Sequence, residues 1–244
     1  MNKLILCEGK TDAILLSYYL GHKNQWRYIK QNKGFRIKAN EVAGEFCEWY
    51  ENSTDRLLIC AVGGKDRFRD FFNKNIARSI VDANFFSKIA VVTDRDNRKI
   101  DAVLSEITTV LAPIKVTLKQ NNWQVGTYTD SYQRDETIET LALIIPTERE
   151  GALETVLLTA IAEDSTDRII VEKSQDFIDD LRKISTIRSK YLSSERLKLK
   201  AKLSVTWSIQ CPDKYFDFFQ DHVSRIDWDK YQTMDQCFAE LAKI

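Results

Sequence analysis

The stretch "LILCEGKTD" (Leu4–Asp12) decides the class of fold. Its first four residues are apolar without interruption, which is typical of a strand buried on both faces of a sheet. Glu8 and Gly9 end this run, and the following residues 11–20 place apolar side chains at helical spacing. The stretch therefore predicts a buried strand that leads through a short charged turn into a helix.

The same strand-then-helix pattern occurs three more times. The further apolar runs are "LLICAV" (Leu57–Val62), "IAVV" (Ile89–Val92) and "TLALIIP" (Thr140–Pro146), and an amphipathic helical pattern follows each of them. Buried strands that alternate with helices indicate an α/β fold, in which a mainly parallel central sheet is flanked by helices and joined by right-handed crossovers. The alternating segment Trp123–Asp130 predicts one more strand, paired with Thr140–Ile145.

Strand patterns stop near residue 165, and the rest of the chain reads as helical. Helical patterns cover residues 174–192, 195–209, 213–227 and 233–244. We therefore predict two parts: an α/β domain over residues 1–165, and a helical C-terminal extension over residues 166–244 that packs on it. Residues 21–55, between the first two strands, form a long insert that the repeated pattern does not explain.

Composition excludes several classes of protein. The 36 basic and 36 acidic residues cancel, so any electrostatic binding surface must be local. The five cysteines are scattered without a CxxC pair, which favours a reducing compartment and argues against a disulfide framework or a cysteine-rich zinc site. Apolar runs are too short to span a membrane. We expect a soluble, cytoplasmic protein.

Carboxylates gather where the predicted strands end. Glu8 ends the first strand, with Asp12 one helical turn further on. Asp94 and Asp96 follow the third strand, and Glu154 begins the helix after the fourth. Functional groups collect at this edge of a parallel α/β sheet, and side chains at i and i+2 of an extended chain point the same way. Clustered carboxylates favour Mg²⁺ or Mn²⁺, which prefer oxygen ligands and offset the repulsion.

Three motifs, in this order, resemble the Toprim domain. They are "LILCEGKTD", "CAVGGKDRF" and "IAVVTDRDN", within roughly residues 3–112. The later "IIPTEREGALETVLL" resembles a stretch of stand-alone Toprim-like proteins related to the nuclease half of the overcoming-lysogenization-defect (OLD) family, without its ATPase half. The resemblance implies a Toprim-like Rossmannoid fold and a site that acts on phosphodiesters with two Mg²⁺ or Mn²⁺ ions.

The resemblance also implies roles for the carboxylates. Glu8 matches a general acid/base or metal ligand of the family, and Asp94 and Asp96 match its metal-binding pair. Asp12 matches an acidic residue of the nuclease branch, and Glu154 matches a later glutamate that helps to hold a second metal. Taken singly, Glu8 and Asp12 are equally well explained as carboxylates that cap the following helix.

Three lysines are candidates for a catalytic role. Lys65 follows the Gly63-Gly64 pair at the end of the second strand, where it could contact a phosphate. Lys200 and Lys202 are the nearest matches to a lysine that stabilises transition-state charge in related nucleases. The alternative for each of them is a solvated lysine, because charged runs most often form exposed faces.

A basic segment in the insert predicts contacts with nucleic acid. Residues 21–40, "GHKNQWRYIKQNKGFRIKAN", carry six Lys or Arg, no acid and three interleaved aromatic residues. Positive charges follow phosphates, and aromatic faces stack on unpaired bases. The predicted contact residues are Lys10, Lys23, Trp26, Arg27, Lys30, Lys33, Arg36 and Arg95. We expect DNA in preference to RNA.

The sequence therefore predicts a metal-dependent nuclease that acts in genome defence or repair. Two alternatives stay open. One is a non-catalytic module that binds nucleic acid or a protein partner and works with a separate ATPase. The other is a metal-dependent nucleotidyl or nucleotide-sugar transferase that uses the Asp-x-Asp motif. The choice between single and double strands and the oligomeric state also stay open.

Overall fold

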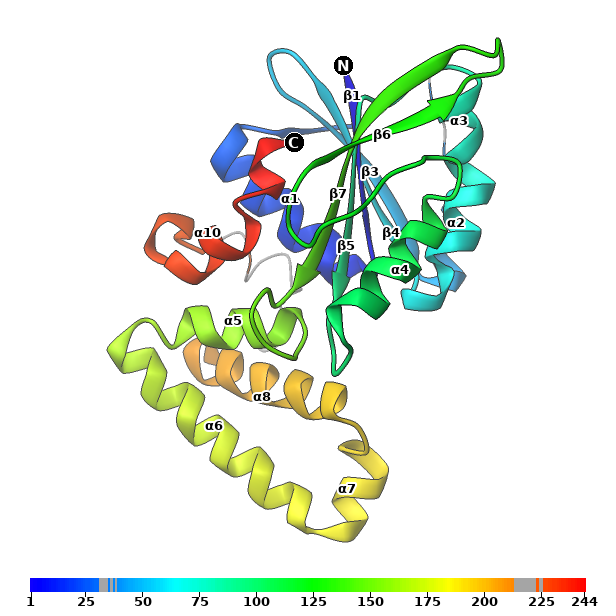
Figure 1. Ribbon diagram of the computed structural model, residues 1–244. Coiled ribbons are helices and arrows are strands. Elements are labelled where there is room, and N and C mark those ends of the chain that lie inside the picture. Colours follow the sequence, from blue (N-terminus) through cyan, green and yellow to red (C-terminus); the bar gives the residue numbers. More distant parts are fainter. Residues whose placement is uncertain (31–34, 36, 38, 213–222, 224–225) are drawn as a thin grey trace.

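A seven-stranded sheet forms the centre of the computed structural model, which describes residues 1–30, 35, 37, 39–212, 223 and 226–244 (Figure 1). The strand order is β2-β3-β4-β1-β5-β7-β6. The strands are β1 (Asn2–Cys7), β2 (Arg27–Ile29), β3 (Glu45–Glu51), β4 (Arg56–Val62), β5 (Lys88–Asp94), β6 (Gln124–Thr129) and β7 (Asp135–Ile145).

The four inner strands β4, β1, β5 and β7 are parallel neighbours. Antiparallel strands complete the sheet, because β3 and β2 extend one edge and β6 pairs with β7 at the other. The inner strands are apolar on both faces because helices cover both faces. The predicted α/β class, a mainly parallel sheet flanked by helices with further helices at the C-terminal end, is confirmed.

Helices form two layers around the sheet and an arm beyond it (Figure 1). The helices are α1 (Lys10–Asn24), α2 (Phe68–Asn75), α3 (Ala77–Val81), α4 (Ile100–Val110), α5 (Leu153–Ile161), α6 (Ser165–Lys183), α7 (Ser185–Tyr191), α8 (Glu195–Gln210) and α10 (Gln232–Phe238). Alternate residues of β1 enter the two cores: Ile5 and Cys7 pack with α1, α5 and α10, whereas Leu4 and Leu6 pack with α2 and α4.

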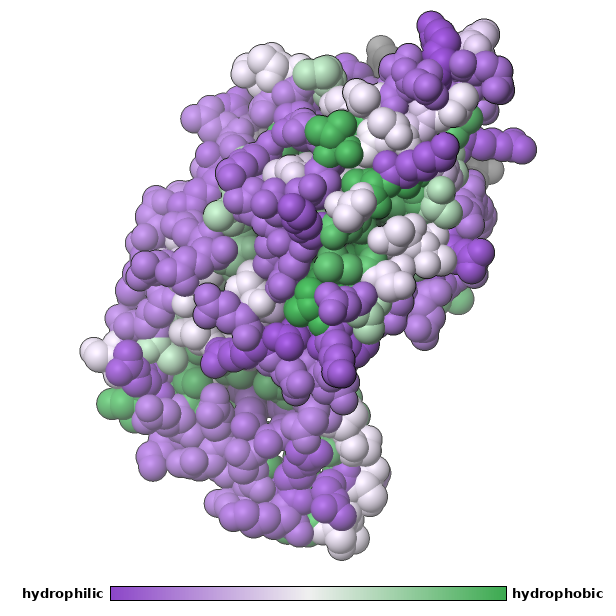
Figure 2. Space-filling view, viewed as in Figure 1, coloured by the Kyte–Doolittle hydropathy of each residue, from purple (hydrophilic) through white to green (hydrophobic). Residues whose placement is uncertain are grey.

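Helices α6, α7 and α8 form the helical arm (Ser165–Gln210), which projects from the sheet and packs on α5 (Figure 1). Helix α6 begins at Ser165 because the carboxylate of Asp164 accepts hydrogen bonds from the N–H groups of Thr166 and Asp167. The predicted single helix over 174–192 is wrong, since α6 ends at Lys183 and α7 begins at Ser185. Hydrophilic residues cover most of the visible face of the arm (Figure 2).

The insert contributes two strands that the sequence pattern did not predict. Strands β2 and β3 lie within residues 21–55 and widen the sheet beyond β4. The strand predicted over residues 123–130 forms as β6, but it pairs with residues 135–140 of β7 and meets the predicted partner 140–145 only at Thr140. The carboxylate of Asp130 sets this register by accepting the N–H groups of Tyr132 and Arg134, which closes a tight turn between β6 and β7.

The helix predicted over 213–227 lies almost wholly outside the described residues. Beyond it, α10 returns to pack on α5, so the end of the chain contributes to the same core as β1 and α1. The boundary near residue 165 stays a prediction. Among the described helices, none is both long enough and apolar enough to cross a membrane.

Ion pairs of Asp55 connect the start of β1 with the start of β4. Its carboxylate lies 2.8 Å from the N-terminal ammonium and 3.1 Å from the Nζ of Lys3. Burial opposes ionisation of Asp55, but hydrogen bonds from these two cations outweigh it and lower its pKa to about 2. This contribution to stability is fully present above the unfolded-state pKa near 4 and is lost as the pH falls toward 2.

We expect Asp55→Asn to lower the free energy of unfolding at pH 7 by about 2 kcal/mol, because each pKa unit corresponds to about 1.4 kcal/mol. Urea titrations followed by circular dichroism at pH 7 and at pH 3 measure this difference, which should shrink at pH 3. Asp82→Asn, at an exposed aspartate, is the matched control. A difference that is the same at both pH values would contradict the assignment.

Candidate active site

Glu8 lies at the end of β1 and is 2% exposed. Its Oε1 accepts hydrogen bonds from the Thr93 hydroxyl at 2.7 Å and from the N–H of Asp94 at 2.9 Å. Both donors lie at the end of β5, which is the parallel neighbour of β1. The carboxylate is therefore fixed in place by the adjacent strand end.

The Gly63-Gly64 turn at the end of β4 also contacts Glu8. Both N–H groups donate to the main-chain carbonyl of Glu8, at 3.1 and 2.9 Å. The turn requires glycine, because Gly63 has φ +84° and a Cβ there would lie 2.2 Å from the carbonyl oxygen of Ala43. Three strand ends thus meet around Glu8.

Asp12 faces Glu8 from the first turn of α1. Its Oδ2 accepts the N–H of Gly9 at 2.7 Å, so it serves the helix end as well as the site. Burial and the negative charge of Glu8 raise the pKa of Asp12 to about 7, in spite of that hydrogen bond. The carboxyl group of Asp12 therefore titrates near pH 7.

Asp94 connects β5 with α5. It is buried, and its Oδ1 accepts the N–H of Leu153 at 2.9 Å. Burial and the charges of Glu8 and Asp12 raise the pKa of Asp94. Asp96 does not lie beside it along an extended strand, because β5 ends at Asp94 and Asp96 has φ +54°. The expectation that Asp94 and Asp96 point the same way along an extended chain is therefore wrong.

Glu154 completes what we call the acidic cluster, formed by Glu8, Asp12, Asp94 and Glu154. It lies in the first turn of α5 and is buried. The negative charge of Glu154 raises the pKa of both Asp12 and Asp94, so Glu154 lies close to these two residues. Its Oε2 is buried and has no hydrogen-bond partner among the described residues. This oxygen is therefore available to a cation.

Two cations face the acidic cluster. The Nζ of Lys65 donates to Asp96 Oδ2 at 2.5 Å and to the carbonyl of Asp94 at 3.1 Å. Arg196, from α8 in the helical arm, lies 3.5 Å from Glu8 Oε2 and 3.6 Å from Asp94 Oδ2. Desolvation opposes the charge of Arg196, but the carboxylates prevail and raise its pKa. Lys65 thus lies at the strand ends beside the acidic cluster, and its role as a phosphate contact stays a prediction.

Sequence reasoning missed Arg196. It is one of eight basic residues between Arg182 and Lys202, and no spacing or motif distinguishes it from the others. Only the packing of α8 on α5 turns it toward the strand ends. Lys202 instead pairs with Asp179 of α6 at 3.2 Å and holds the arm together. Lys200 is exposed, and no ion pair joins it to the acidic cluster within the described part of the chain.

The predicted nucleic-acid residues are placed in different ways. Lys10, Arg27 and Lys30 are exposed. Lys23 pairs with Asp229 and Asp235, and the Nε of Arg95 donates to the carbonyl of Arg98.

Trp26 is 5% exposed and lies beneath the Nζ of Lys3, 5.7 Å from the ring centroid. Its ring is therefore packed against the protein and offers little area for stacking on a base. Lys33 and Arg36 lie outside the described residues. Among the described residues of this segment, Arg27 and Lys30 are thus open to solvent, whereas Trp26 is not.

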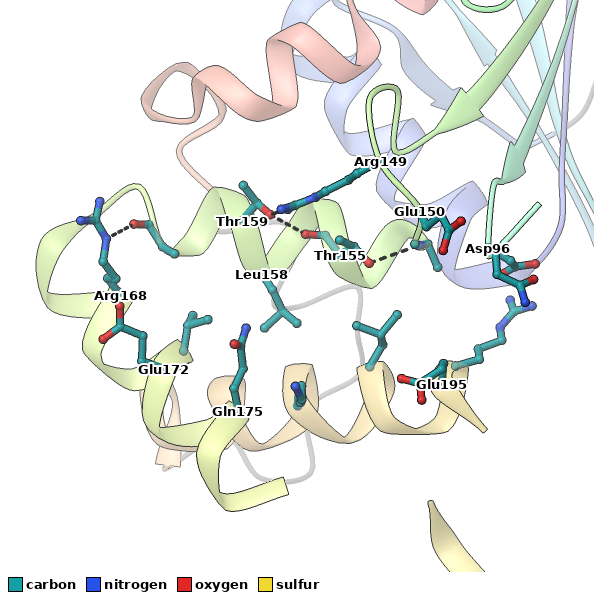
Figure 3. A pocket seen from close by; sticks show the side chains of 18 residues that line it. Asp96, Arg149, Glu150, Thr155, Leu158, Thr159, Arg168, Glu172, Gln175 and Glu195 are labelled. Atoms are coloured by element: carbon teal, nitrogen blue, oxygen red, sulfur yellow. Dashed lines mark hydrogen bonds between the residues drawn. The ribbon is translucent and has the colours of Figure 1, made fainter. Parts of the chain in front are cut away.

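A groove of about 920 Å³ leads from Asp96 between α5 and the helical arm (Figure 3). Arg149 and Arg168 lie along it, and Arg196 and Glu195 lie where it meets the strand ends. Basic and acidic side chains both line this arm groove, which opens beside the candidate site; the acidic ones are Asp96, Glu150, Glu172 and Glu195.

The donor set fits a hard divalent cation in its chemistry. No three His, Cys, Asp or Glu side chains in the described part of the chain are arranged so that they could hold a metal ion together. Hydrogen bonds from N–H and O–H groups and contacts with Arg196 engage Glu8 and Asp94 instead. The free Oε2 of Glu154 and the all-oxygen donors are those that Mg²⁺ and Mn²⁺ accept.

Comparison with known proteins places the chain in a family. The model of the family described as "Protein of unknown function (DUF3226)" matches residues 2–239. The chain belongs to this family. Comparison with curated proteins gives no match. Among solved structures, hypothetical protein PH0156 from Pyrococcus horikoshii OT3 is similar at 19% identity and a TM-score of 0.49, over 98% of this chain and 99% of that chain.

We expect Asp12→Asn to raise the melting temperature in EDTA at pH 8, where ionised Asp12 repels Glu8 and Glu154. A gain of about 1 kcal/mol would raise it by about 2–4 °C in a chain of this size. Thermal melts followed by circular dichroism measure the shift. Asp101→Asn, at an exposed aspartate in the first turn of α4, is the matched control and should not raise it. A lower melting temperature for Asp12→Asn would show that its helix bond outweighs the repulsion.

Proposed function

We propose that this protein is a nuclease that hydrolyses phosphodiester bonds of nucleic acid with Mg²⁺ or Mn²⁺ bound at the acidic cluster. The observation that carries the proposal is the burial of Glu8, Asp94 and Glu154 together, with one oxygen of Glu154 left without a partner. Buried carboxylates that repel one another cost free energy and mark functional sites more often than structural ones. The resemblance of three motifs to the Toprim domain supports the same function.

The four residues of the acidic cluster, with Asp96 beside them, are those that would hold two metal ions. When bound, such ions polarise the phosphoryl oxygens and activate a water molecule. Because the pKa of Asp12 is raised to about 7 without a metal, its carboxyl group would release a proton on binding an ion. The buried hydrogen bonds of Glu8 fix the orientation of its carboxylate.

Lys65 and Arg196 are the groups that would bind the substrate phosphate. Both already donate to carboxylates at the strand ends, so a phosphate oxygen could replace those acceptors with little rearrangement. The planar guanidinium of Arg196 suits two phosphate oxygens at once. Arg149 and Arg168 would attract further phosphates along the arm groove.

We place this activity in the cytoplasm, on DNA in preference to RNA, in genome defence or repair. A binding module that works with a separate ATPase is the second candidate, and one observation favours it. Lys65 and Arg196 already counter the charge of Glu8, Asp94 and Asp96, so the site is partly neutralised by its own side chains. Cleavage and binding assays separate the two functions.

We expect the purified protein to cut plasmid DNA or circular single-stranded DNA in Mg²⁺ or Mn²⁺ and not in EDTA. Asp94→Asn should lower the rate by a factor of about 10² or more, because it removes a charged ligand from the reacting site. The asparagine oxygen can still accept the N–H of Leu153, so the fold should persist. Asp101→Asn is the control. Equal cutting by Asp94→Asn would refute the metal nuclease, and binding without cutting would favour the module.

We expect Mn²⁺ to raise the melting temperature of the wild-type protein, because a ligand that binds only the folded state stabilises it. Glu154→Gln should reduce this rise, since it removes the charge of a cluster carboxylate whose buried Oε2 has no hydrogen-bond partner among the described residues. Thermal melts across a Mn²⁺ titration measure it, with Glu172→Gln, at an exposed glutamate of the arm groove, as control. An unchanged response of Glu154→Gln would remove this residue from the proposed metal site.

A further inference from the structure

A second cavity, of about 800 Å³, runs along α1. On this helix it is lined by Lys10, Ile14, Ser17, Tyr18, Gly21 and His22. These positions recur every three or four residues and therefore form one face of the helix. At 1.5 Å per residue, Lys10 and His22 are about 18 Å apart along the axis. The cavity is thus an elongated cleft, nearly as long as the helix.

Aromatic side chains form the opposite wall of this cleft. Phe46, Glu48 and Tyr50 occupy alternate positions of β3, so they share one face of the strand. Tyr28 of β2 lies opposite Tyr50 in the sheet, with ring centroids 6.0 Å apart. Tyr28 is 57% exposed, so most of its ring remains free. We call this feature the aromatic cleft.

Charged groups in the aromatic cleft are few and are placed at distinct points. Lys10 lies at the end nearest Glu8, and its Nζ is 5.4 Å from the centroid of the Phe46 ring. His22, at the other end of α1, is paired with Asp229. Between them, Glu48 accepts a hydrogen bond from the Tyr50 hydroxyl at 2.9 Å. Lys10 thus lies at the end of the cleft near the acidic cluster, and mainly aromatic side chains line the rest of the cleft.

We propose that the aromatic cleft binds unpaired bases of a single-stranded nucleic acid whose phosphodiester is cut at the acidic cluster. Aromatic rings stack on bases of any sequence, and a lysine beside the first ring can contact the intervening phosphate. The carboxylate of Glu48 can accept from amino groups of base edges. A duplex keeps its base faces inside the stack and cannot enter. This inference rests on the proposed nuclease function and specifies its substrate as single-stranded.

Binding without cutting tests this inference directly. Fluorescence anisotropy in EDTA compares a labelled single-stranded oligodeoxynucleotide with the duplex of the same sequence. We expect the wild-type protein to prefer the single strand, and Tyr28→Ala to weaken that binding by about tenfold, as for the loss of one stacked base. Tyr28→Phe, which keeps the ring, should restore it. Duplex binding should change little in either variant.

The matched control is Tyr132→Ala, because Tyr132 is 75% exposed and lies in the turn between β6 and β7. Thermal melts confirm that each variant is folded. Equal single-strand affinities of folded Tyr28→Ala and wild type would overturn the inference, as would equal wild-type affinities for single strand and duplex. Because EDTA prevents metal-dependent cutting, this failure is separate from failure of the nuclease, in which the cleft binds but Mn²⁺ yields no cleavage.

Discussion

The arrangement of the strand ends depends on the hydrogen bonds that Glu8 accepts. Its Oε1 accepts two donors from the end of β5, and its main-chain carbonyl accepts two N–H groups from the end of β4. Without this carboxylate, the Thr93 hydroxyl and the N–H of Asp94 would lose their partner in a buried site, which costs about 1–3 kcal/mol per group. The same residue therefore orders the sheet edge and supplies the negative charge around which the candidate site forms.

That charge is balanced by two cations of different character. Lys65 is held by the body of the protein, at 2.5 Å from Asp96. Arg196 is half-exposed, belongs to the arm and reaches Glu8 and Asp94 only at 3.5 and 3.6 Å. Because its contacts are long and solvated, Arg196 is the cation that can change partner at least cost. The arm thus connects the acidic cluster to the groove that leads away from it.

The sequence predicted those parts of the site that local pattern determines. Uninterrupted apolar runs located the inner strands, and carboxylates at their ends located Glu8, Asp94 and Glu154 near one another. Other features depend on packing between distant segments. The turn at Asp96, the pairing of β2 with β3 and the approach of Arg196 are set by neighbours that no local spacing reveals. Trp26 illustrates the same limit. As an aromatic residue in a basic segment it predicted stacking on a base, but its ring is buried beneath Lys3.

Helix α1 relates the two candidate binding features to each other. Its first turn carries Asp12, which faces Glu8, and its side carries the residues that line the aromatic cleft. Glycine at position 9 leaves room for the Asp12 carboxylate at the start of this helix, because a Cβ there would lie 3.2 Å from Asp12 Oδ2. An α-helix keeps a fixed rise per residue, so the distance from the acidic cluster to each point of the cleft is fixed by the backbone. A strand held in the cleft would therefore meet the carboxylates at a constant number of nucleotides from its bound bases.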